Sequence, residues 1–177
     1  MRRRAVTLWH PSRRALWATI CAVTLALRAT TVAAAAGEGA RIGKPAPNFS
    51  VEDLHGKPVV LNAYRSRPIF ITVFATWCSP CRKELSYVVR RFPRYRSRVV
   101  FVGIDEQESP SIVKAFAASL SLPFGVGIDP GAVAVDYGVR ALPLSVFIDR
   151  DGIVRALVRG SLRPPIFERD IALIDGR

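Results

Sequence analysis

The chain has 177 residues, with 26 basic residues against 14 acidic ones and a formal net charge of +12. Six of the arginines lie in the first 36 residues, so the charge is concentrated at the N-terminus and does not argue for a nucleic-acid-binding protein. The sequence contains no internal repeat and no low-complexity tract, and its length allows one domain with a full hydrophobic core.

The N-terminal segment has the pattern of a secretory signal. Its six arginines are accompanied by no acid, and they are combined with an apolar run from Ala15 to Leu27 and a small-residue tract from Ala33 to Ala36. The apolar run is shorter than the roughly 20 residues that cross a bilayer, so we expect residues 1–36 to be a cleaved signal peptide, with an uncleaved membrane anchor as the alternative. Ser12-Arg13-Arg14 leaves twin-arginine export open beside the general secretory route.

The remaining residues, 37–177, are expected to form a single domain with 20 basic and 14 acidic residues, a net charge of +6. Residues 37–47 are rich in glycine and proline and predict an irregular lead-in. Phe49 to Asp53 and Pro58 to Leu61 are strand-like pieces around the turn sequence His55-Gly56-Lys57. They predict a small β-hairpin before the core.

Strands and helices then alternate along the chain. Apolar, β-branched runs predict strands at 69–75, 99–105, 124–128, 144–149 and 153–158. Helices are expected from Cys78 to about Arg91, where Pro93 would stop the helix, and then from Ser109-Pro110 to about Leu120, over a brief stretch ending near Tyr137, and at 164–174. This order predicts an α/β fold with a mixed sheet and helices on both faces.

The sequence Trp77-Cys78-Ser79-Pro80-Cys81 lies between the first long strand and the helix that follows it. A cysteine at a helix N-terminus is close to unpaired N–H groups and the positive end of the helix dipole, which favour the thiolate. Cys78 is therefore the candidate nucleophile. Cys81 lies almost one turn later and can attack a disulfide made by Cys78, so the pair can cycle between dithiol and disulfide.

Other readings of the two cysteines are possible. A structural zinc site needs four Cys or His ligands, and outside the pair the sequence offers only Cys21, His10 and His55, of which the first two lie in the signal segment. We therefore expect no metal and no cofactor. A peroxidatic cysteine, or a static disulfide in a binding module, remains an alternative to a redox pair.

Five arginines cluster near the end of the helix that starts at Cys78. They are expected either to lie on a solvated helix end, where cations complement the helix dipole, or to form a docking patch for an acidic partner or anionic lipid. The cluster consists of Arg90, Arg91, Arg94, Arg96 and Arg98.

The segment Ala75 to Leu85, which contains the two cysteines and Glu84, resembles the active site of the thioredoxin superfamily, in particular its extracytoplasmic TlpA/ResA-like branch. The resemblance covers about residues 42 to 174, and Ala46 to Phe49 matches a frequent opening of that branch. It implies a thioredoxin-like fold with an N-terminal hairpin and a central helix–strand insertion. It also implies that the protein is a thiol-disulfide oxidoreductase.

Further site residues follow from this resemblance. Gly138 to Pro143 is similar to the segment that carries the family's cis-proline, although an ordinary X-Pro bond is trans. Leu142 would then contact an extended substrate peptide, and its alternative is an ordinary buried leucine. Trp77 is expected either in the apolar rim beside Cys78 or in a packing role.

Glu84, three residues after Cys81, is expected on the same helix face. It is either a residue that tunes the thiol pKa values and moves a proton, or an exposed first-turn acid that stabilises the helix dipole. Many thioredoxins have a buried acid six residues before the first cysteine, and here that position is Thr72, which cannot titrate.

The sequence therefore predicts an exported thiol-disulfide oxidoreductase, active in the periplasm or otherwise outside the cytoplasm. The resemblance favours a reductant of protein disulfides, and a disulfide-forming oxidase or a peroxidase is the alternative. Implied partners are a membrane thiol reductant as electron donor and, as substrates, apocytochrome c or a copper-site assembly protein. We expect a monomer that binds no nucleic acid.

Overall fold

The sheet is built around β3 (Ile69–Phe74), a strand in which every residue is buried. In the computed structural model, which describes residues 39–176, β3 pairs in parallel with β4 (Val100–Glu106) and antiparallel with β6 (Leu144–Ile148). Near-continuous apolar runs are typical of strands that are covered on both faces. The expected signal segment, residues 1–36, lies outside the described residues.

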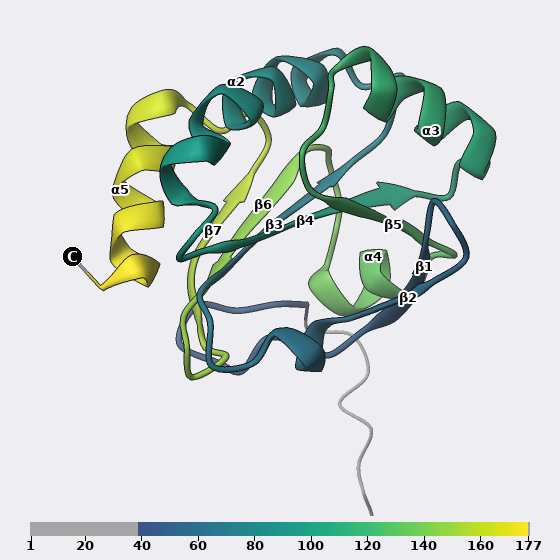
Figure 1. Cartoon of the computed structure of the whole chain (residues 1–177). Coiled ribbons are helices and arrows are strands. Elements are labelled where there is room, and N and C mark those ends of the chain that lie inside the picture. The colour runs from purple at the N-terminus through teal and green to yellow at the C-terminus, as the bar shows by residue number, and fades with distance from the viewer. Residues whose placement is uncertain (1–38, 177) are drawn as a thin grey trace, which may run out of the picture. The chain divides into compact units, whose positions relative to one another are not determined.

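Four further strands extend the sheet on its two sides, in the order β2-β1-β5-β4-β3-β6-β7. β5 (Gly125–Asp129) is parallel to β4, and β7 (Val154–Arg159) forms an antiparallel hairpin with β6. β1 (Ser50–Asp53) and β2 (Pro58–Val60) form the expected hairpin, followed by a 3₁₀ turn, η1 (Leu61–Tyr64), that the sequence did not predict. The predicted mixed sheet, the N-terminal hairpin and the helix–strand insertion of α3 and β5 are confirmed (Figure 1).

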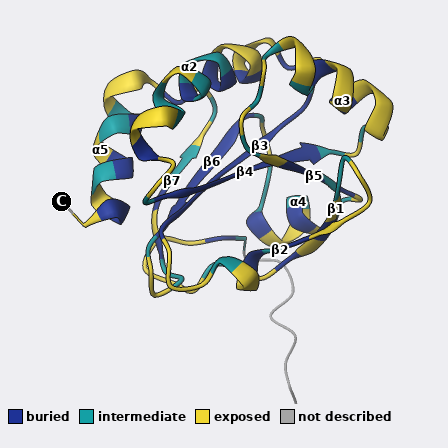
Figure 2. Ribbon diagram, in the orientation of Figure 1, coloured by how far each residue is buried: buried dark blue, intermediate teal, exposed yellow. Residues whose placement is uncertain are grey.

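Helices cover both faces of this sheet. α2 (Ser79–Tyr95), α3 (Pro110–Ser119) and α5 (Pro164–Asp175) lie on one face, and the short α4 (Ala132–Tyr137) lies on the other (Figure 1). Alternate residues of β3 serve the two layers, since Phe70 packs with Phe167 of α5 and Ile71 belongs to the cluster that contains Tyr137 of α4. The central strands are buried, whereas the outer surfaces of the helices are exposed (Figure 2).

The N-terminal hairpin joins the sheet through a close approach of β1 to β5. Asp53 is opposite Gly127 in the antiparallel register, and a Cβ atom built on Gly127 would lie 2.4 Å from Cγ2 of Val51. No side chain fits at that separation, so glycine at this position is what lets the hairpin pack against β5.

The helix after the cysteines is longer than expected. Pro93 was predicted to stop it, but α2 continues to Tyr95 with Pro93 in its last turn. A proline removes one helical N–H and strains one turn, and here that turn is held by tertiary contacts. Tyr95 is buried, and its hydroxyl donates a hydrogen bond to Glu168 of α5.

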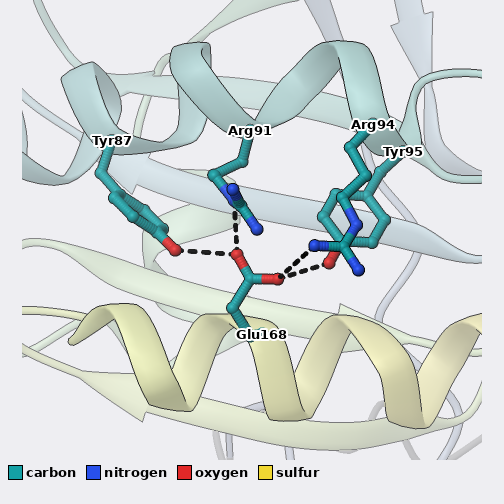
Figure 3. A network of polar contacts seen from close by, with 5 residues as sticks. All are labelled: Tyr87, Arg91, Arg94, Tyr95 and Glu168. Carbon is teal, nitrogen blue, oxygen red and sulfur yellow. Dashed lines mark hydrogen bonds and ion pairs between the residues drawn. The ribbon is translucent and has the colours of Figure 1, made fainter.

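Glu168 also explains part of the arginine cluster. Its carboxylate accepts hydrogen bonds from the Tyr87 hydroxyl at 2.8 Å and from Arg91 Nε at 2.6 Å, and Arg94 approaches it at 3.9 Å (Figure 3). α2 is thereby fixed to α5 by one carboxylate that receives donors from three turns of the facing helix.

A second ion pair joins the turn after α2 to the end of α5, between Arg98 Nε and the buried carboxylate of Asp175 at 2.9 Å. The expectation that the whole arginine cluster lies on a solvated helix end or a docking patch was therefore wrong for Arg91 and Arg98. Sequence distance hid these pairs, because their acids lie 77 residues further along the chain.

Within residues 39–176, no helix is both long enough and apolar enough to cross a membrane.

Candidate active site

The cysteines lie where β3 ends and α2 begins. Cys78 is the N-cap residue of α2, Pro80 occupies its first turn, and the backbone N–H of Cys81 donates to Cys78 Sγ at 3.2 Å. The two sulfurs are joined in a disulfide. The sequence-based placement of Cys78 against the N–H groups of a helix terminus is confirmed, and this environment stabilises a thiolate when the pair is reduced.

The two sulfurs differ in their access to solvent. Cys78 is 5% exposed and Cys81 is fully buried. Trp77, directly before them, is 73% exposed, so the alternative of a pure packing role for Trp77 was wrong. Any partner that approaches the disulfide meets Cys78 and Trp77 before Cys81.

Glu84 lies one turn beyond Cys81 and is only 4% exposed. Its Oε1 accepts hydrogen bonds from the hydroxyls of Thr72 at 3.0 Å and Ser145 at 2.6 Å, and its Oε2 accepts one from the Leu162 N–H at 3.1 Å. The alternative of an exposed first-turn acid was therefore wrong.

Burial raises the pKa of the Glu84 carboxyl above its ordinary value, although the three hydrogen bonds act in the opposite direction. Thr72 occupies the position that holds a buried acid in many thioredoxins. Threonine cannot titrate there, but its hydroxyl donates a hydrogen bond to Glu84, which can. A buried titratable group thus lies on the helix of the cysteine pair, in the neighbouring turn.

The Leu142–Pro143 peptide bond is cis, as the resemblance predicted. Pro143 is buried directly before β6, and Leu142 is half-buried. Leu142 packs against the cluster that contains Cys78 and Cys81 as well as against the α4-side core. Leu142 therefore contacts both the cluster of the redox pair and the core on the α4 side of the sheet.

One part of the site was not found from the sequence. Glu108, in the loop after β4, accepts hydrogen bonds from the N–H and the hydroxyl of Thr76 at 2.5 and 2.7 Å, and its own N–H donates to Asp105. Asp105 is completely buried at the end of β4. An acid at the end of a buried strand, beside the strand that leads to Cys78, was the signal that could have revealed this contact.

Among the described residues, no group of three or more His, Cys, Asp or Glu side chains is placed to hold a metal ion.

Comparison with known proteins identifies the family. The model of the AhpC/TSA family matches residues 42–157, which include both cysteines, Glu84 and the cis-proline segment. The chain belongs to this family.

Two relatives carry the name of the same chemistry. The thiol-disulfide oxidoreductase ResA of Bacillus thuringiensis is 39% identical over 125 residues, which cover 70% of this chain and 72% of the relative. ResA of Bacillus subtilis is 33% identical over 122 residues, covering 68% of each chain. This protein is a thiol-disulfide oxidoreductase, as the sequence predicted.

A solved structure supports the fold. The thiol:disulfide interchange protein of the thioredoxin family from Chlorobium tepidum superposes with a TM-score of 0.67 and 29% identity, covering 77% of this chain and 99% of that one. The predicted thioredoxin-like fold is confirmed.

Proposed function

We propose that the protein reduces disulfide bonds of other proteins outside the cytoplasm, with Cys78 as nucleophile and Cys81 as the resolving thiol. The observation that carries this proposal is the asymmetry of the pair. Cys78 has its sulfur at a helix terminus with some exposure, and Cys81 has none. A protein substrate can form a bond with Cys78 only, and Cys81 is left to break that bond from inside.

The reaction exchanges one disulfide for another. The reduced Cys78 thiolate attacks one sulfur of the substrate disulfide, and the second substrate sulfur leaves as a thiolate that takes up a proton. Cys81 then loses its proton and attacks Cys78, which restores the Cys78–Cys81 disulfide and releases the first substrate sulfur as a thiolate. Two electrons pass from the protein to the substrate, and an external dithiol must supply them for the next cycle.

Glu84 is proposed as the group that takes the Cys81 proton. It is the buried acid one turn from Cys81, and burial raises the pKa of its carboxyl, which makes it a better proton acceptor than a solvated carboxylate. Its hydrogen bonds to Thr72 and Ser145 fix its position relative to the sheet.

Trp77, Leu142 and Pro143 are proposed as the substrate contacts. The exposed indole of Trp77 offers apolar surface beside Cys78. Leu142 packs against the hydrophobic cluster that contains Cys78 and Cys81. An extended peptide pairing with the backbone before the cis-proline would bring its disulfide to Cys78.

The direction of electron flow and the partners extend this proposal. The names of the ResA relatives specify thiol-disulfide exchange and no direction. We assign the reducing direction from the resemblance to the extracytoplasmic branch, with a membrane thiol reductant as donor. Apocytochrome c and copper-site assembly proteins are the proposed substrates, and residues 1–36 are the proposed export signal or anchor. The protein is proposed to act as a monomer.

Trapping tests the proposal directly. Cys81→Ala in the reduced protein should hold a substrate on Cys78 as a mixed disulfide that dithiothreitol releases, whereas Cys78→Ala should trap nothing. A redox titration of the wild-type protein against glutathione and dithiothreitol should place its potential near the reducing end of the range from about −270 to −120 mV. A potential at the oxidising end, or turnover of peroxide at the rate of disulfide exchange, would replace the reductase by one of its two alternatives.

A further inference from the structure

The carboxyl group of Asp105 has an unexplained oxygen. Asp105 is 0% exposed, and its Oδ1 accepts the Glu108 N–H at 3.1 Å. Among the residues that the structure describes, its buried Oδ2 has no hydrogen-bond partner. An ionised carboxylate can only accept, and a buried acceptor without a donor is costly, so this oxygen needs either a donor or a proton of its own.

The group beside it supplies the answer. Burial, and after it the interaction with the Glu108 carboxylate, raise the pKa of Asp105 to about 7. Two neighbouring carboxylates do not both ionise easily, and a proton shared between them replaces their repulsion by a hydrogen bond. With a proton on Oδ2, Asp105 becomes the donor and Glu108 the acceptor, and the unpaired oxygen is accounted for.

Glu108 connects this pair to the redox site. Its two oxygens also accept the Thr76 N–H and hydroxyl, and Thr76 stands two residues before Cys78. Asp105 is opposite Phe74 in the β3–β4 register, and Phe74 belongs to the cluster that contains both cysteines. The acid pair therefore lies against the turn that carries the disulfide.

Few charged groups act on Asp105. Its register partners are apolar, Phe74 on β3 and Ile128 on β5. Glu106 and Glu108, both in its own segment, are the charges that raise its pKa. The charged side chains on α3 and the first two turns of α2, which pack on this face of the sheet, are Arg82, Lys83, Glu84 and Lys114.

We propose that Asp105 is a positioning residue for the cysteine pair. A proton shared with Glu108 keeps Glu108 on Thr76, and its loss at higher pH places a second negative charge beside the disulfide and loosens the turn before Cys78. The proton leaves to solvent, and no electron moves in this step. This inference rests on the proposed function in that the turn it controls is the one that carries the reactive cysteines.

The titration itself can be observed without any activity. Carbon-13 NMR of the carboxyl groups in the oxidised protein should show Asp105 titrating near pH 7, where ordinary carboxyls have long been ionised. The Asp105→Asn variant assigns the signal by its absence. A midpoint below about 5 would overturn the inference and leave the proposed function untouched.

A kinetic readout tests the connection to the cysteines. Dithiothreitol should reduce the Cys78–Cys81 disulfide of the wild type and of Asp105→Asn at similar rates at low pH, because asparagine can donate to Glu108 as protonated Asp105 does. As the pH rises through 7, the ratio of wild-type to variant rate should fall by about 2- to 10-fold, because a new negative charge repels the attacking thiolate. Taking the ratio cancels the ionisation of the reagent. A flat ratio would overturn the proposal.

Two further variants complete the test. Glu106→Gln removes the charge next to Asp105 and leaves both members of the acid pair in place. The rate of its reduction by dithiothreitol, divided by the rate for Asp105→Asn, should therefore still fall as the pH rises through 7. If Asp105→Asn fails to fold, Glu108→Gln takes its place, since loss of the carboxylate partner should move the Asp105 titration to lower pH in the NMR experiment. An unchanged midpoint in Glu108→Gln would contradict the shared proton. Failure of the proposed function would show separately, as absence of trapped substrate in Cys81→Ala.

Discussion

Thr72 and Ser145 are directly opposite each other on the neighbouring strands β3 and β6, and both hydroxyls donate to the same oxygen of Glu84. The pairing of the two strands thus places two hydrogen-bond donors beside one acid of α2, the helix that carries the cysteines. Burial still raises the pKa of Glu84 despite these donors. The folded protein therefore binds a proton at Glu84 at pH values where the unfolded chain has released it.

Glu84→Gln should change how stability depends on pH. Above the ordinary carboxyl pKa of 4.5 the unfolded chain loses this proton while the folded protein keeps it, so the free energy of unfolding falls as the pH rises through that window to the raised pKa. Glutamine removes this contribution. We expect the free energy of unfolding in urea to fall less between about pH 5 and pH 8 for the oxidised variant than for the oxidised wild type. A larger loss in the variant would contradict the assignment.

The same variant tests the proton transfer. Without a base, Cys81 loses its proton more slowly, and kcat for a protein disulfide should fall about 100-fold at neutral pH, the lower end of general-base effects. Accumulation of the Cys78 mixed disulfide should accompany the slower turnover. Glu52→Gln, which alters an exposed acid of β1, is the matched control. Equal turnover in the two variants would remove Glu84 from the reaction.

Gly127→Ala should destabilise the protein. The new Cβ would lie 2.4 Å from Val51 Cγ2 in the seam between the hairpin and β5. Relief of this overlap must shift β1, at a cost of about 1–3 kcal/mol in thermal or urea unfolding.

Gly125, two residues earlier in β5, is the natural control, because a Cβ there meets nothing within 4 Å. Gly125→Ala should change stability by less than about 0.5 kcal/mol. In the double variant Val51→Ala/Gly127→Ala, the smaller side chain should recover part of the loss. If the Gly127→Ala protein is as stable as Gly125→Ala, β1 can move away from β5 without a measurable cost, which would contradict the prediction.

The elements of the core could be predicted from the sequence because their signals are local. The apolar run of β3, the turn at Cys78 and the apolar runs of β6 and β7 each depend on residues that are neighbours in the chain. The cis bond at Pro143 came from resemblance alone, since local physics favours trans.

The errors share a different cause, which is contact between distant residues. The end of α2 depends on Glu168, which is 73 residues beyond Tyr95. The burial of Glu84 depends on Ser145 and Leu162, and the environment of Thr76 depends on Glu108. No periodicity within a helix records which acid of another element faces it, so these polar contacts were visible only in the fold.

Glu168→Gln tests the connection between α2 and α5. Burial opposes ionisation of Glu168, but hydrogen bonds from Arg91, Tyr95 and Tyr87 outweigh it and lower the pKa of Glu168 to about 2. Its stabilising contribution is therefore full above the ordinary pKa of 4.5 and is lost as the pH falls toward 2.

Because the Glu168 side chain is 29% exposed, we expect a loss of about 1–2 kcal/mol at pH 7 in the glutamine variant. The difference from the wild type should shrink at about pH 3, as the wild-type carboxylate approaches protonation. Glu52→Gln, on the exposed hairpin, should show neither effect. A difference that stays constant with pH would assign the loss to shape and not to charge.

Trp77→Ala separates substrate recognition from chemistry. The indole is 73% exposed, so its removal should change the free energy of unfolding by less than about 0.5 kcal/mol. If Trp77 packs against bound polypeptide, kcat/KM for a protein disulfide should fall about tenfold through KM, as is typical of an aromatic contact. Reduction by dithiothreitol, which is too small to need that contact, should proceed at the wild-type rate.

Val135→Ala, at a 64% exposed position of α4 on the other face of the sheet, is the control and should alter neither rate. Equal slowing of both reactions by Trp77→Ala would mean that the indole acts on Cys78 itself and not on the substrate.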